Sequence, residues 1–166
     1  MIPADDKVWA RAFALQALSD LRARDVLERE GIDKCHKLHF LQMAAEKTCK
    51  AYLIGTSGYG AVKFSHAYVA KYIPIIARQW YGVAADRVPS RRQLSRIKQL
   101  AHEIELLSPA CDENGQRRDN SEYPWMDDKG RVQTPCSFGF PNIDDSARSI
   151  VPLVRLIRLA AQKYSG

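Results

Sequence analysis

The chain has 166 residues, of which 46% are hydrophobic, and it carries a formal net charge of +6 at pH 7. This length and composition predict a single domain with an apolar core of useful size. No stretch approaches the roughly 18 uncharged apolar residues that a membrane span needs, and the first residues lack the basic-then-apolar order of a secretory signal. We therefore expect a soluble, cytoplasmic protein.

The charge is distributed unevenly along the chain. Residues 112–145 hold eight acidic and four basic residues, a net charge of −4, so the remainder carries +10. A body this basic attracts polyanions such as RNA, although a charged surface that only keeps a protein soluble has the same composition. The four cysteines are scattered through a chain too large to need disulfides, so we expect reduced thiols.

Apolar residues at helical spacing predict a long first helix over residues 5–30. Acidic residues stand at its start and Gly31 follows its end, as is typical of helix boundaries. The residues expected on its buried side are Val8, Ala12, Leu15, Leu18 and Val26.

A second helix is predicted over residues 36–54, because three glycines within six residues, beginning at Gly55, are expected to end it. Its buried stripe is expected to hold Leu38, Leu41, Ala45, Cys49 and Tyr52. The charges of Glu46, Lys47 and Lys50 would then fall toward the other side of the helix.

Three more helices follow. The third is expected from His66 to about Tyr81, capped by Ser65 and bent or divided by Pro74; the fourth begins after Ser90. The fifth begins near Asp144 or Asp145 and tolerates Pro152 in its first turns. The buried positions expected in the last two helices are Leu94, Ile97, Ala101 and Ile104, and Ile150, Val154, Ile157 and Ala161.

Residues 112–143 lie between the fourth and fifth helices and are too numerous for an ordinary structureless connection. Four aromatic residues in this excursion argue against disorder, since such rings usually dock on a surface: Tyr123, Trp125, Phe138 and Phe140. We expect an ordered segment packed on the helices, with a short hairpin turning at Asp128-Lys129-Gly130. The predicted fold class is all-α, an antiparallel four- to five-helix up-down bundle with a long ordered excursion before the last helix.

Few side chains suggest catalysis. Arg96 and His102 have a spacing that a metal-independent ribonuclease could use, the histidine moving a proton and the arginine stabilising the phosphate. Six residues on a straight helix place two side chains about 120° apart, so this pair needs a kink or a partner subunit to converge. Cys35 and His39 supply only two ligands where zinc wants three or four, and we expect neither a metal nor a cofactor.

Three short motifs resemble the HEPN domain family. "HFLQMAAEKTCKAYL" is similar to the signature of that family's second helix, "FSHAYVAKYIPIIAR" to the histidine that opens its third, and "RRDNSEYPW" to an arginine-tyrosine-proline element after its fourth. The resemblance implies an antiparallel helical bundle, commonly a homodimer. Such domains occur in prokaryotic defence, toxin–antitoxin and stress loci, where some members bind nucleotides or RNA and others cut RNA.

The resemblance also implies site residues. The polar face of the family's second helix falls on Glu46, Lys47 and Lys50, and its histidine on His66. Its later element falls on Arg118, Tyr123 and Pro124, and the neighbouring Arg117 joins the expected ligand-binding set. Two departures are visible: Glu122 rather than an arginine precedes Tyr123, and no histidine follows Arg117 or Arg118.

Three functions are compatible with these residues. The first is a non-catalytic HEPN-like domain that binds a nucleotide, RNA phosphate or a partner protein through Lys47, Lys50, His66 and nearby arginines. The second is an endoribonuclease toxin that uses Arg96 and His102 across a dimer. The third is a structural dimerisation or interaction module in which Glu46 and Lys50 form a surface pair. A cognate nucleotidyltransferase or antitoxin is the protein partner that the resemblance implies.

Overall fold

The computed structural model describes residues 5–62, 67–84, 90–108, 119–143 and 150–166, with residues 80–84 described by their backbone alone. These residues form five antiparallel α-helices and a two-stranded hairpin before the last helix, which confirms the predicted fold class. None of the described helices is both long and apolar enough to cross a membrane. The helices are α1 (Asp6–Arg29), α2 (Lys34–Ser57), α3 (Val69–Ala84), α4 (Arg91–Glu105) and α5 (Ile150–Ser165).

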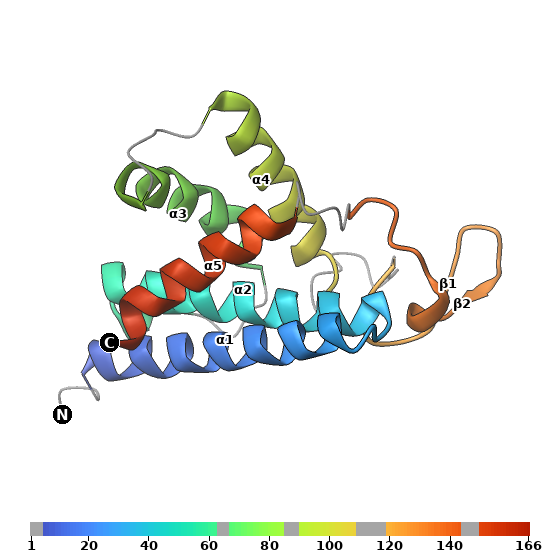
Figure 1. Cartoon of the computed structure of the whole chain (residues 1–166), viewed down its shortest axis with the longest axis horizontal. Helices are drawn as coiled ribbons and strands as arrows, with labels where there is room; N and C mark the ends of the chain where they lie inside the picture. Colours follow the sequence, from blue (N-terminus) through green and yellow to red (C-terminus); the bar gives the residue numbers. More distant parts are fainter. Residues whose placement is uncertain (1–4, 63–66, 85–89, 109–118, 144–149) are drawn as a thin grey trace.

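Helix α2 is the centre of the bundle, because it packs against each of the other four helices. In Figure 1, α1 and α2 lie side by side along the bottom, α5 crosses above them, and α3 and α4 form the top of the molecule. The five residues predicted to form the buried stripe of α2 are indeed buried, but so are residues on its other sides, including Gln42, Ala44 and Ala51. A helix surrounded in this way has no polar face of its own.

The predicted buried side of α1 is wrong. Val8, Leu15 and Val26 are 58%, 47% and 45% exposed, and the helix buries its other side instead. The buried apolar residues are Ala10, Ala14, Ala17 and Leu21. Small side chains on this side allow α1 to pack closely against α2 and α5. The stability gained from this packing depends on the shape of the neighbouring helices and cannot be read from the hydrophobicity of α1 alone.

The helix boundaries agree with the capping residues predicted from the sequence, except at the end of α2. Gly55 does not end α2; the helix continues to Ser57 and stops at Gly58, whose φ of +82° favours glycine. Helix α4 begins as predicted, because the Ser90 side chain accepts a hydrogen bond from the Gln93 backbone and the Gln93 side chain accepts one from Ser90. Pro152 stands in the first turn of α5, whereas the expected helix starts at His66 and near Asp144 lie outside the described residues.

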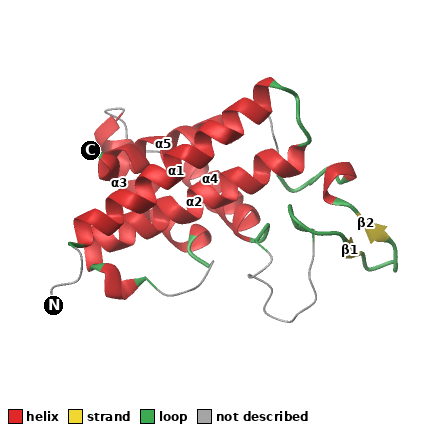
Figure 2. Cartoon of the chain, turned by 90° about the horizontal axis from the view of Figure 1, so that it is seen from below, coloured by secondary structure: helices red, strands yellow, loops and turns green. Residues whose placement is uncertain are grey.

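The described part of the excursion, residues 119–143, is ordered and contains the predicted hairpin. Strands β1 (Trp125–Met126) and β2 (Val132–Gln133) pair antiparallel, and Gly130 supplies the positive φ of +73° in the turn. A short 3-10 helix, η3 (Pro135–Ser137), follows. Figure 2 shows that the two strands lie outside the helical body.

The contacts that attach the described part of the excursion to the bundle include hydrogen bonds from Lys34 and the burial of Phe140. Lys34 at the start of α2 donates hydrogen bonds from Nζ to the carbonyls of Gly139, Phe140 and Ile143 at 3.0, 3.3 and 2.8 Å. Phe140 is completely buried, and Phe138 makes edge-to-face contacts with it and with Trp125 at 5.1 and 5.0 Å. Three of the four aromatic residues that predicted a docked segment therefore form a set of contacting rings that runs from the hairpin into the core, whereas the fourth, Tyr123, is 60% exposed.

Candidate functional site

Glu46 and Lys50 form an ion pair inside the bundle rather than on its surface. Lys50 Nζ lies 2.6 Å from Glu46 Oε1, and Gln42 donates a hydrogen bond to Glu46 Oε2 at 3.2 Å. The ammonium group also lies over the rings of Phe13 and Tyr68, 5.9 and 5.4 Å from their centroids. The pairing at four-residue spacing is confirmed, but the expected exposed position is wrong because Glu46 is only 4% exposed.

Lys47 is paired across the first two helices. Its Nζ lies 2.5 Å from Oδ2 of Asp20, and Gln16 donates a hydrogen bond to Oδ1 of the same carboxylate at 3.1 Å. Asp20 is buried on α1, so this pair joins α1 to α2. Both lysines of the motif thus have a carboxylate partner within the protein, and their charges are compensated there.

The other residues implied by the resemblance are not brought to these lysines by any described contact. His66, Arg117 and Arg118 lie outside the described residues. Tyr123 is 60% exposed, and its backbone is held by the buried side chain of Asn120, which accepts a hydrogen bond from the Tyr123 N–H at 2.6 Å. Pro124 lines a groove beside the hairpin.

Arg96 and His102, the candidate catalytic pair, are both exposed on α4. The helix runs without interruption from Arg91 to Glu105, so nothing in its secondary structure supplies the break that convergence requires. At 100° per residue the two side chains leave the helix about 120° apart. Within one chain this pair therefore lacks the shared geometry of a general acid–base site.

The exposed side of α4 carries a concentration of positive charge that the three motifs did not indicate. Every charged residue from position 91 to position 102 is basic or, for His102, able to become so, and all are exposed: Arg91, Arg92, Arg96, Lys98 and His102. We call these five residues the α4 basic face; they span about 16 Å along the helix at 1.5 Å per residue and about 160° of its circumference at 100° per residue. The signal was present in the sequence as "RRQLSRIKQLAH", where four bases occur without an acid. The resemblance instead implies a site at Lys47 and Lys50.

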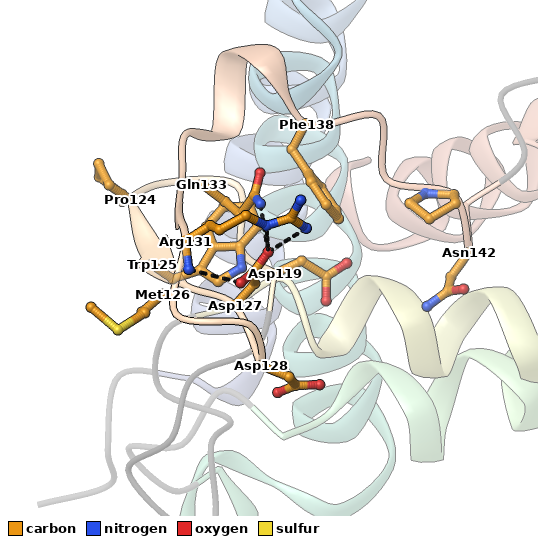
Figure 3. A pocket seen from close by; sticks show the side chains of 11 residues that line it. Asp119, Pro124, Trp125, Met126, Asp127, Asp128, Arg131, Gln133, Phe138 and Asn142 are labelled. Atoms are coloured by element: carbon orange, nitrogen blue, oxygen red, sulfur yellow. Dashed lines mark hydrogen bonds and ion pairs between the residues drawn. The ribbon is translucent and has the colours of Figure 1, made fainter.

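A groove beside the hairpin is the second feature that the sequence did not indicate. Its walls come from β1, β2, the turn between them and the segments on either side of the hairpin (Figure 3). The groove is open on one side and has a volume of about 910 Å³. The side chains that line it are Asp119, Pro124, Trp125, Met126, Asp127, Asp128, Arg131, Gln133, Phe138, Pro141 and Asn142. It became recognisable only when the hairpin brought residues from both ends of the segment together.

The three described cysteines, Cys35, Cys49 and Cys136, are free thiols, as expected. Burial raises the pKa of the Cys49 thiol well above its usual value, with Glu105 and Glu46 adding to the effect. A thiol that stays protonated is a poor nucleophile, so Cys49 belongs to the core.

Comparison of the chain with models of protein families, with curated proteins and with solved structures gave no match.

Proposed function

We propose that this chain is a non-catalytic, HEPN-like helical domain that binds RNA phosphates through the α4 basic face. The observation that carries the proposal is the set of five exposed side chains on α4 that are basic or, for His102, able to become so, with no acidic residue from Arg91 to His102. Phosphate contacts by lysine and arginine dominate the affinity of proteins for nucleic acids. The resemblance of the α2 motif to HEPN domains supports the choice of RNA over other polyanions.

The pairing of the motif lysines with carboxylates moves the expected ligand-binding surface. Lys47 and Lys50 are compensated by Asp20 and Glu46, so a phosphate at these lysines would have to displace a carboxylate at 2.5 or 2.6 Å. The arginines of the α4 basic face are long, exposed side chains suited to bidentate phosphate contacts. In Figure 1, α4 lies on the side of the molecule opposite α1.

Fluorescence anisotropy with a labelled single-stranded RNA tests the proposal. We expect Arg92→Gln combined with Arg96→Gln to weaken binding at low salt about tenfold. The slope of log affinity against log salt should fall by about 0.7 for each phosphate that the variant no longer neutralises. The matched control is Arg22→Gln combined with Arg29→Gln, which removes two exposed arginines from α1 and should leave most of the affinity. Lys47→Gln should change the affinity less than twofold.

Two results would contradict the proposal. Equal loss of affinity in the α1 and α4 double variants would mean that binding follows net charge alone. If the RNA is cut, and both Arg96→Ala and His102→Ala abolish cleavage in folded protein, the domain is instead the endoribonuclease of the second hypothesis. We expect the RNA to remain intact.

A further inference from the structure

The groove beside the hairpin has the dimensions of a ligand site. Its volume of about 910 Å³ lies at the upper end of the range found for small-molecule pockets, roughly 300–1,000 Å³. It lies in the acidic part of the chain and is lined by none of the α4 basic face residues, so it is separate from the proposed RNA surface.

Two aromatic rings form part of its wall. Trp125 and Phe138 are both half-buried and meet edge to face at 5.0 Å, an arrangement that fixes their orientation. Phe138 is held in turn by the completely buried Phe140. The faces of such rings attract cations through their quadrupoles, most strongly for tryptophan.

The groove also carries carboxylates that no described residue pairs. Among the residues that the structure describes, neither Asp119 nor Asp128 has a hydrogen-bond or ion-pair partner. The third carboxylate is occupied: Asp127 accepts hydrogen bonds from Arg131 Nε at 2.9 Å and Gln133 Nε2 at 2.8 Å. Arg131 is neutralised by this contact, which leaves two carboxylates for a ligand (Figure 3).

We propose that this groove binds a guanidinium or alkylammonium group, with its alkyl chain against Trp125 and Phe138 and its charge shared by Asp119 and Asp128. Carboxylates supply the acceptors that a guanidinium or ammonium group needs, and the rings add attraction for the cation while shielding its apolar stem. Such a group occurs both in free polyamines and in the arginine and lysine side chains of peptides. The recognition chemistry is the same for either source.

Isothermal titration calorimetry on the full chain tests this site with three probes: spermidine, argininamide and the peptide acetyl-Gly-Arg-Gly-amide. We expect at least one probe to bind with a stoichiometry of one. Asp119→Asn combined with Asp128→Asn should weaken that binding tenfold or more, and Trp125→Leu should weaken it several-fold. Glu30→Gln, which removes an exposed carboxylate that does not line the groove, should leave it unchanged. Circular dichroism of each variant establishes that it is folded.

The three probes distinguish the source of the ligand. Binding of spermidine or argininamide identifies a free cation as sufficient, whereas binding of the peptide alone identifies a peptide side chain with its backbone. The proposal is overturned if no probe binds, if the double aspartate variant binds as well as the unaltered protein, or if Glu30→Gln weakens binding to the same extent as that variant.

Discussion

Glu46 is the residue of the α2 motif whose position in the structure differs most from its expected exposed position. It is buried on α2, accepts a hydrogen bond from Gln42, and lies against the Lys50 ammonium, itself placed over two aromatic rings. An exposed pair at this spacing contributes only about 0.3–0.5 kcal/mol. A pair in the interior is different, because either charge is costly to leave without its partner.

Glu46→Met tests this interior pair. The substitution keeps the side-chain volume but leaves the Lys50 ammonium without its carboxylate, and we expect the free energy of unfolding to fall by about 3 kcal/mol. Urea unfolding followed by circular dichroism measures the change. Glu46→Met combined with Lys50→Met removes both charges and should recover much of the loss. A cost below about 1 kcal/mol for Glu46→Met alone would show that the pair behaves as a solvated surface pair.

At the scale of secondary-structure elements, α1 is a helix that the sequence predicts correctly but whose buried side it predicts wrongly. Its large apolar residues Val8, Leu15 and Val26 are exposed, whereas its alanines are buried at Ala10, Ala14 and Ala17. Hydrophobic periodicity identifies a helix face from the apolar residues that recur at helical spacing, whatever their size. Close packing against α2 and α5 instead selects the face with the smallest ones.

Two leucine substitutions on α1 distinguish the faces. Ala14 is completely buried and Ala12, two residues earlier on the same helix, is exposed. We expect Ala14→Leu to overpack the helix contact and lower the free energy of unfolding by about 1–3 kcal/mol. Ala12→Leu should remain within about 0.5 kcal/mol of the unaltered protein. Urea titrations of both variants measure the difference, and the reverse order of effects would restore the face predicted from periodicity.

The hairpin is an element whose stability should depend on pH. The backbone N–H of Arg131 and then its guanidinium donate hydrogen bonds that hold the pKa of Asp127 well below its usual range; Gln133 and Lys129 add two more. A carboxyl whose pKa is depressed on folding stabilises the folded hairpin above its unfolded value of about 3.9. This stabilisation decreases as the pH falls below that value and is lost once the pH passes the folded pKa.

Amide hydrogen exchange at Arg131, measured by NMR at a series of pH values, tests this dependence. After correction for intrinsic exchange rates, protection of the Arg131 N–H should decline as the pH is lowered below about 4. Asp127→Asn should reduce protection at neutral pH and abolish the decline, because no titrating carboxyl remains. Unchanged protection in the variant would show that the turn forms without this carboxylate.

At the scale of the whole molecule, two exposed surfaces of opposite character lie on different parts of the chain. The α4 basic face carries exposed arginine and lysine at the top of the bundle, and the acidic, aromatic groove lies beside the hairpin at its end (Figure 1). The net charge of +6 does not reveal this separation, because it is the sum of a negative charge on residues 112–145 and a larger positive charge on the remainder of the chain. The proposed RNA surface and the proposed cation groove can therefore be tested independently of each other.

The sequence by itself determined the elements. The helices, the Ser90 cap of α4 and the glycine turn at Gly130 follow from local properties, and the structure has all three, although α1 buries another side than its periodicity predicted and α2 continues past Gly55. The aromatic residues of the excursion likewise indicated a docked segment, because Phe140 gains stability only by burial.

Only the tertiary structure decided which sides of these elements meet. Glu46 and Lys50 were identified as a pair but assigned to the surface, since their burial depends on helices that surround α2 from distant parts of the chain. The groove depends on folding in a related way: Asp119, Trp125 and Phe138 are separated by 6 and 13 residues in the sequence and line one groove only because the hairpin folds the segment back on itself. Local patterns determine backbone conformation through short-range sterics and hydrogen bonds, whereas burial and charge compensation depend on which other elements pack against a residue.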